Sequence, residues 1–154
     1  MGDLSRRGFI GRGIAGVAGA GACLCGVGGC ATFSKIGDTP PLAAAAYRRQ
    51  QNTLVIDLAR APELRQVGGS AKIVAAGVIL ARVGEKAFVA AALRCTHRGV
   101  ELEYDHDEKV FECASLGDSE YRLDGTNIDG PATRPLQVFR TSLVGDKLTV
   151  KLGG

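Results

Sequence analysis

Two cysteines and two histidines lie in the second half of the chain, and three of these four residues have a spacing that could bind a metal. Cys95 and His97 belong to the run Cys-Thr-His-Arg-Gly, and Cys113 follows at the end of a β-like segment. Thiolates and imidazoles are ligands that zinc, copper and iron–sulfur centres prefer. Groups of this kind on two neighbouring loops predict one metal centre between them.

These residues resemble the Rieske family, in which Cys-x-His from one loop and Cys-x-x-His from a second hold a 2Fe–2S cluster. The resemblance extends to residues 121–136, where Gly-Pro-Ala-Thr-Arg-Pro-Leu is similar to the loop that covers the cluster in that family. It spans residues 53–152. It implies an all-β fold, a small antiparallel β-sandwich or barrel with a two-loop subdomain that binds the cluster. It also implies that Cys95, His97 and Cys113 are ligands.

The second loop departs from the family pattern because the second histidine is missing. Counting forward from Cys113 places that histidine at Leu116, and counting back from Ser-Glu-Tyr at 119–121 places it at Gly117. Neither residue is a metal ligand. The other histidine of the chain, His106, lies in the charged run Tyr-Asp-His-Asp-Glu and is expected in a solvated turn.

Three protein ligands leave one position of the second iron without an imidazole. Asp118, Ser115 or water would supply an oxygen donor there, which would lower the potential and weaken the site. The extra cysteine pair of quinol-oxidising Rieske proteins is also absent, since Val100 and Ser115 stand at those positions. Whether the chain binds a 2Fe–2S cluster therefore stays open at this point.

Short strands from Thr53 onward must position these residues. Alternating Leu148, Val150 and Leu152 indicate a half-buried strand, and the Gly-Asp pair before them is typical of a tight hairpin. No segment has a long 3.6-residue apolar period, so the pattern favours a sandwich or barrel. The predicted strands are 53–58, 78–83, 87–93, 109–113, 136–144 and 147–152.

The first thirty residues are typical of an export signal. Arg6 and Arg7, with Phe9 after them, resemble the twin-arginine motif. The apolar stretch 10–29 is rich in glycine, which disfavours a transmembrane helix. It ends in Val-Gly-Gly before Cys30, which resembles a lipobox and predicts a lipid anchor on that cysteine. An ordinary secretory signal and an uncleaved anchor are the alternatives.

The chain has 19 basic and 16 acidic residues. Three of the basic residues, Arg6, Arg7 and Arg12, precede residue 31. The remainder is close to neutral and carries no basic run, so a nucleic-acid partner is not expected. The predicted organisation is a signal and lipobox at 1–30, a tether at 31–52 and a Rieske-like domain at 53–154. The predicted location is the periplasmic or extracytoplasmic face of a membrane.

Two functions from different classes are compatible with these features. The first is an electron-transfer protein, tethered at the outer face of a bacterial membrane, that works with a respiratory or oxidoreductase complex. The alternative is a cluster-free structural or interaction module in which Cys95 and Cys113 form a disulfide. No catalytic residue is assigned, because residues spaced like Cys95 and His97 seldom point at each other and the chain has no room for an oxygenase domain.

Overall fold

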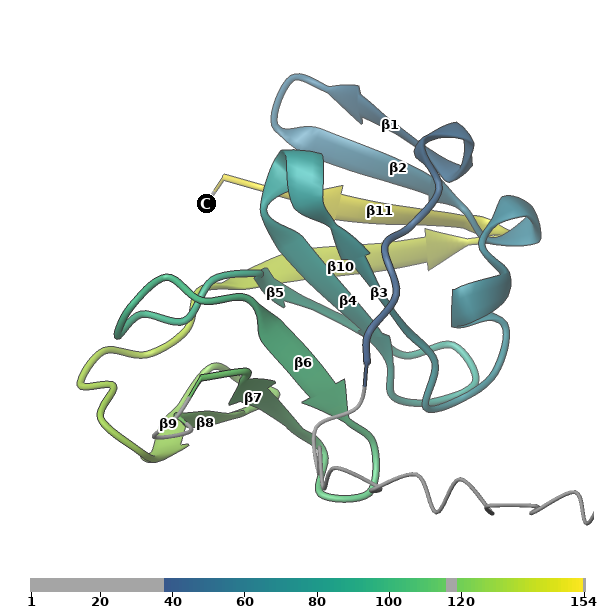
Figure 1. The fold of residues 1–154 in the computed structure, drawn as a ribbon. Coiled ribbons are helices and arrows are strands. Elements are labelled where there is room, and N and C mark those ends of the chain that lie inside the picture. Colours follow the sequence, from purple (N-terminus) through teal and green to yellow (C-terminus); the bar gives the residue numbers. More distant parts are fainter. Residues whose placement is uncertain (1–37, 116–118, 154) are drawn as a thin grey trace, which may run out of the picture. The chain divides into compact units, whose positions relative to one another are not determined.

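The computed structural model describes residues 38–115 and 119–153. The predictions for Arg6, Arg7, Cys30, Leu116 and Gly117 lie outside these described residues. Within the described part, the longest helices are single 3-10 turns, and none has the length and hydropathy needed to cross a bilayer. The strands form two sheets, in which every pair of named strands is antiparallel (Figure 1).

The larger sheet has seven strands in the order β1-β2-β11-β10-β5-β4-β3. We call it the large sheet. Its strands are β1 (Tyr47–Gln50), β2 (Thr53–Asp57), β3 (Ser70–Ile73), β4 (Val78–Arg82), β5 (Phe88–Ala92), β10 (Val138–Val144) and β11 (Lys147–Lys151).

The small sheet has four strands in the order β6-β7-β8-β9. It is built entirely from the chain between β5 and β10. Its strands are β6 (Leu102–Asp105), β7 (Val110–Cys113), β8 (Glu120–Arg122) and β9 (Asn127–Asp129). The 3-10 turns are η1 (Ala44–Ala46), η2 (Leu58–Arg60), η3 (Pro62–Leu64) and η4 (Val74–Ala76), all outside this sheet.

All six predicted strands are present to within two residues, and the all-β prediction is confirmed. The Gly145–Asp146 hairpin is also confirmed, because Val144 pairs directly with Lys147. Alternation of apolar and polar side chains identifies such strands because successive residues point to opposite faces.

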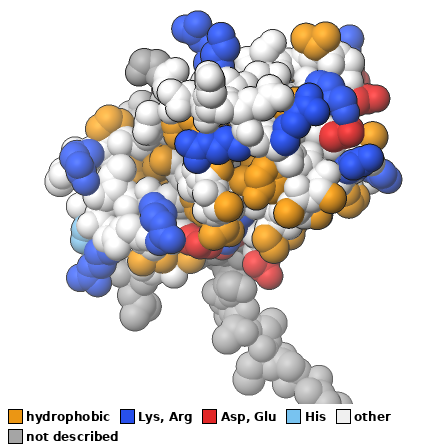
Figure 2. Space-filling model, turned by 90° about the horizontal axis from the view of Figure 1, so that it is seen from above, with side chains coloured by type: hydrophobic (Ala, Val, Ile, Leu, Met, Phe, Trp, Pro, Cys, Tyr) orange, Lys and Arg blue, Asp and Glu red, His pale blue; other side chains and the backbone are white. Residues whose placement is uncertain are grey.

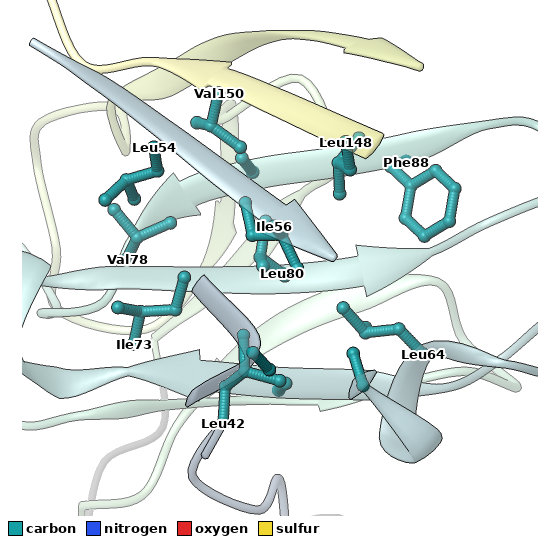
Figure 3. Close-up of a cluster of buried hydrophobic side chains, with 14 residues drawn as sticks. Leu42, Leu54, Ile56, Leu64, Ile73, Val78, Leu80, Phe88, Leu148 and Val150 are labelled. Carbon is teal, nitrogen blue, oxygen red and sulfur yellow. The ribbon is translucent and has the colours of Figure 1, made fainter. Parts of the chain in front are cut away.

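Strands β4 and β5 are buried on both faces and separate two hydrophobic cores. Val78 and Leu80 of β4 point into the first core, whereas Ile79 and Ala81 point into the second. A period of two along one strand therefore supplies both cores. The first core lies within the curl of the large sheet, where side chains from β2, β4 and β11 meet Leu42 and Leu64 (Figure 3).

The second core joins the large sheet to the small sheet. Residues of β4 and β5 pack there against side chains of β6, β7 and β8, and both cysteines of the described part belong to it. The small sheet is therefore held by burial of apolar area, which is the main stabilising term in such contacts.

The predicted tether at 31–52 needs correction, because its described part belongs to the fold. Residues 47–50 form β1, which pairs with β2 along its whole length. Ahead of it, the Leu42 amide donates to the Lys72 carbonyl at 2.8 Å, and the Lys72 amide donates to the Pro40 carbonyl at 2.8 Å. Backbone hydrogen bonds to the sheet hold residues 40–50 in place. The side chains of this segment show no apolar period, which is why the sequence predicted a tether.

Candidate metal centre

One face of the small sheet carries the second thiol. Cys113 pairs with Leu102 on β6, and Phe111 pairs with Tyr121 on β8. Directly paired residues of antiparallel strands point to the same face, as do residues two apart along one strand. Cys113, Phe111, Leu102 and Tyr121 therefore line one face, and all four are fully buried.

The first thiol reaches this face from the loop between β5 and β6. An isolated bridge pairs Arg94 with Glu101, and the Cys95 amide donates to the Val100 carbonyl at 2.8 Å. The Gly99 amide donates back to the Cys95 carbonyl at 2.9 Å, with Gly99 in the left-handed region at φ +71°. This tight turn presents the Cys95 sulfur to the Tyr121 hydroxyl, at 3.2 Å.

A directed chain of hydrogen bonds begins at the Cys95 sulfur. The Thr96 hydroxyl donates to the Arg134 carbonyl at 2.9 Å, so its oxygen is free to accept from the Tyr121 hydroxyl, also at 2.9 Å. The Tyr121 oxygen accepts from the Thr96 amide at 3.2 Å. With Cys95 protonated, the thiol can donate to Tyr121. With Cys95 ionised, the Tyr121 hydroxyl must turn and donate to the sulfur.

The two thiols have opposite pKa shifts. Burial raises the pKa of Cys95, but hydrogen bonds from the Tyr121 hydroxyl, the His97 and Arg98 amides and the Cys113 thiol outweigh it, so the pKa of Cys95 is lowered. Burial raises the pKa of Cys113, and ionisation of the neighbouring Cys95 raises it further. Each thiol influences the pKa of the other, so the two side chains lie close enough to interact within the second core.

The second loop is anchored beside Cys113. The Ser115 hydroxyl lies 3.1 Å from the Cys113 sulfur, and the Cys113 amide donates to the Ser119 carbonyl at 2.9 Å. Ser115, predicted as one possible oxygen donor to iron, therefore contacts a thiol in this structure. The other predicted donor, Asp118, lies outside the described residues.

The histidines are placed differently from the thiols. His97 is exposed, and no three His, Cys, Asp or Glu side chains of the described part come together as a metal-binding group. His106 follows β6 at the end where Asp105 pairs with Val110, whereas Cys113 pairs with Leu102 at the other end of this hairpin. At about 3.3 Å per residue, the length of the hairpin separates His106 from the thiols.

The Gly-Pro loop at 130–136 closes over the first loop. The Arg134 guanidinium donates to the Thr96 carbonyl at 3.1 Å, in return for the bond that the Thr96 hydroxyl gives to the Arg134 carbonyl. The Ala132 amide donates to the Ser119 hydroxyl at 3.1 Å. Ala132 and Leu136 are buried in the second core, so this loop shields the thiols from water.

Two contacts of this site were not predicted from the sequence. The roles of Tyr121 and Thr96 at the Cys95 sulfur depend on the β6-β7-β8 register. A usable signal was the spacing of Phe111, Cys113 and Tyr121, because alternating large or sulfur-containing residues on neighbouring strands share one buried face.

A model of the Rieske [2Fe-2S] domain matches residues 55–140, which cover both loops, the small sheet and strands β3, β4 and β5 of the large sheet. The chain belongs to the Rieske family of iron–sulfur electron-transfer proteins. The predicted family is therefore confirmed. The assignment of Cys95, His97 and Cys113 as ligands stays a prediction, as does the lipid anchor.

Curated relatives of this Rieske chain match over a limited segment. The cytochrome b6-f complex iron-sulfur subunit 1 of Synechocystis sp. is 32% identical over 56 residues, which are 36% of this chain and 31% of that protein. The corresponding subunit of Gloeobacter violaceus is 36% identical over 56 residues, which are 36% of this chain and 30% of that protein. The match thus spans less than a third of each relative.

Two solved structures are similar to this Rieske chain. The plasma membrane Rieske protein PetC3 of Synechocystis has a TM-score of 0.43 and 27% identity, over 48% of this chain and 75% of that chain. The ferredoxin of carbazole 1,9a-dioxygenase from Nocardioides aromaticivorans has a TM-score of 0.44 and 17% identity, over 49% of this chain and 75% of that chain.

The residues present fit one end of a 2Fe–2S cluster. Cys95 and Cys113 are adjacent, buried and supplied with hydrogen-bonding partners, as two thiolate ligands of one iron require. For the imidazole end, the first loop offers His97, whereas His106 lies beyond the far end of the β6–β7 hairpin. The described residues therefore place two thiols and one histidine on or beside the two loops.

Proposed function

We propose that this chain is an exported Rieske electron-transfer protein, tethered at the outer face of a bacterial membrane, with an incomplete imidazole end. The observation that carries the proposal is the pair of buried, neighbouring thiols in a chain that belongs to the Rieske family. A bound 2Fe–2S cluster would supply one-electron redox chemistry. Cys95 and Cys113 would hold one iron and His97 the other.

The remaining residues of the site stabilise charge and exclude water. The Tyr121 and Ser115 hydroxyls are placed to donate to ionised sulfur atoms, which favours the thiolate form that metal binding needs. Ala132 and Leu136 are buried in the same core as the thiols, which excludes water from it. The exposed edge at His97 is the side from which an electron donor or acceptor would approach. An oxidoreductase or respiratory complex is the proposed partner, since the curated relatives are named as cytochrome b6-f subunits.

An iron assay on protein purified from its own host tests the cluster. We expect about two iron atoms and two sulfide ions per chain, with an electron paramagnetic resonance signal on reduction. His97→Ala should lower the iron content and change the spectrum, whereas the matched variant His106→Ala should leave both unchanged, because His106 lies at the far end of the β6–β7 hairpin. Iron content near zero in the unaltered protein would exclude this function.

Export and anchoring belong to the same proposal. Arg6 and Arg7 direct translocation of the folded protein, and Cys30 carries lipid as the first residue of the mature chain, ahead of a tether that ends before Thr39. Replacing both arginines by lysine should leave the protein in the cytoplasm, whereas Arg12→Lys should not. Mass spectrometry of the mature N-terminus should find a lipidated Cys30, and an unmodified N-terminus elsewhere would contradict the anchor.

A second candidate function is a protein-interaction domain of the same fold without iron. The observation that favours it is the position of His106, which lies at the end of the β6–β7 hairpin opposite Cys113. The chain has two histidines, so no residue other than His106 could supply an imidazole beside that of His97. The two functions are distinguished by the iron assay above. A colourless, iron-free and fully folded protein from the native host would support the interaction domain.

A further inference from the structure

Cys95 and Cys113 are two thiols in one buried place, and no disulfide joins them in this structure. The described residues add no third metal-binding side chain beside them. We propose that the pair has a second state, a Cys95–Cys113 disulfide, which forms when the cluster is absent and then prevents iron from binding. The proposal rests on the proposed function only in that the cluster is the competitor for the two sulfur atoms.

The geometry brings the two sulfur atoms together without a rearrangement of the sheets. Cys113 lies on the buried face of the small sheet, diagonal to Tyr121, since Tyr121 pairs with Phe111 two residues away. The Cys95 sulfur lies 3.2 Å from the Tyr121 hydroxyl above the same face. Diagonal neighbours of this kind are within reach of long side chains. Both thiols therefore belong to the core around Tyr121, and each influences the pKa of the other.

Neither cysteine lies in the middle of a strand, so the backbone at both positions can move. Cys95 belongs to a turn rather than to a strand, and Cys113 is the last residue of β7, followed by exposed Ala114. A disulfide needs Cα atoms about 4.4–6.8 Å apart, and movement of these loop residues can adjust that distance. The incomplete imidazole end weakens cluster retention, so the empty dithiol is a state that this chain reaches more readily than a four-ligand Rieske protein.

Burial selects the oxidant. Cys95 is 3% exposed and Cys113 is 0% exposed, so a bulky disulfide cannot reach either sulfur, whereas a small neutral peroxide can. The Cys95 sulfur attacks one peroxide oxygen: an S–O bond forms, the O–O bond breaks, and water leaves. The Cys113 sulfur then attacks the Cys95 sulfenic acid, so that an S–S bond forms and a second water leaves. In total, two thiols and one hydrogen peroxide give one disulfide and two water molecules.

The consequence is a site that reports its redox environment. Iron binds thiolates, so the disulfide form cannot ligate iron until a reductant returns two electrons and two protons. The Cys95→Ser and Cys113→Ser variants separate the steps. Cys113→Ser should stop at the sulfenic acid on Cys95, which dimedone traps when the protein is then unfolded. Cys95→Ser should resist peroxide because its remaining thiol is fully buried.

The test uses the mature full-length protein, freed of iron by a chelator under reducing, anaerobic conditions and then given one equivalent of hydrogen peroxide. We expect a loss of about two mass units, loss of both thiols that alkylate in the unfolded protein, and a 95–113 cross-linked peptide on digestion. Iron uptake should recover only after reduction. The proposal is overturned if both thiols stay alkylatable or if Cys95 proceeds to the sulfinic acid. Iron-free protein from the host contradicts the proposed function alone, whereas iron-loaded protein whose stripped form makes no disulfide contradicts this inference alone.

Discussion

The hydroxyl of Tyr121 lies 3.2 Å from the sulfur of Cys95 and 3.2 Å from the backbone nitrogen of Thr96, so one side chain of β8 joins the first loop to the small sheet. We predict that Tyr121→Phe lowers the free energy of unfolding by about 1–2 kcal/mol, because the partly buried Thr96 amide loses its acceptor. Urea unfolding of iron-free protein measures this loss. Tyr104→Phe is the matched control, since that hydroxyl lies 3.2 Å from the ring of the exposed His106, and it should cost less. Equal losses would mean that the Tyr121 hydroxyl contributes nothing specific.

Arg134 and Thr96 exchange two hydrogen bonds between the Gly-Pro loop and the first loop. Arg134→Ala removes only the bond from the guanidinium, on the surface. We therefore expect global stability to change by less than about 1 kcal/mol, whereas the amides of residues 96–99 exchange faster with solvent. Hydrogen–deuterium exchange detects this difference. Arg98→Ala, which alters an exposed arginine of the same loop, should leave exchange unchanged. Unchanged exchange in Arg134→Ala would show that the Thr96 hydroxyl alone holds the two loops.

Lys72 and Glu103 form a buried ion pair between β3 and β6, and each residue is 8% exposed. Glu103 also accepts from the Thr39 amide at 2.7 Å, so the pair fixes the N-terminal segment as well. Lys72→Met should cost about 3–5 kcal/mol, because it leaves a buried carboxylate without its cation. Adding Glu103→Gln should recover part of the loss, since the amide oxygen can still accept from Thr39.

Thermal unfolding of the single and double variants measures this coupling. Glu101→Gln is the control, because Glu101 is more exposed and its carboxylate lies 3.8 Å from the Lys72 ammonium. It should cost less than about 1 kcal/mol. A Lys72→Met variant as stable as the control would mean that Glu103 is already satisfied by Thr39.

The strands that sequence analysis predicted are those whose apolar residues alternate or run continuously, such as β4 and β11. Strand β1 was missed because Tyr-Arg-Arg-Gln is polar, and its pairing with β2 uses backbone groups that carry no side-chain pattern. Strand β6 was missed because Glu103 occupies a buried position. Its partner Lys72 is 31 residues away, and sequence periodicity contains no information on such a pair.

The candidate site shows a similar division. The Cys-Thr-His motif and the later cysteine predict two neighbouring thiols through their resemblance to the Rieske loops, and the structure places Cys95 in a turn and Cys113 at the end of β7. The exposure of His97 and the contact between Ser115 and Cys113 depend on loop conformation. The sequence does not contain that conformation.

The distribution of surface charge is also set by the fold. Lys and Arg side chains lie in separate groups on the face shown in Figure 2, a distribution that net charge alone does not give.

Gly125 turns the chain between β8 and β9, with φ at +89°. A Cβ atom there would lie 2.2 Å from the Leu136 carbonyl oxygen, which is backbone and cannot move alone. Gly145, at φ +56°, has no atom within 4 Å of its Cβ position. Gly145→Ala should therefore cost about 1 kcal/mol from backbone strain alone, and Gly125→Ala distinctly more. Denaturant unfolding compares the two, and similar costs would show that the Gly-Pro loop adjusts freely.

Asp57 pairs directly with Lys147 across β2 and β11, with their charged atoms 2.6 Å apart. The hydrogen bond from Lys147 is the main cause that holds the pKa of the Asp57 carboxyl below its usual 3.8, with smaller help from Arg60 and the Ala59 amide. A carboxyl whose folded pKa is depressed stabilises the fold above the unfolded pKa, and this stabilisation is lost as pH falls from 3.8 through the folded pKa.

Asp57→Asn should therefore lower the urea midpoint at neutral pH but not at pH values below the folded pKa. The asparagine can still accept from the Ala59 amide, so the η2 cap is retained. Asp146→Asn, in the adjacent hairpin turn, is the control and should keep the acid-dependent slope. A slope that persists unchanged in Asp57→Asn would assign the acid sensitivity to other carboxylates.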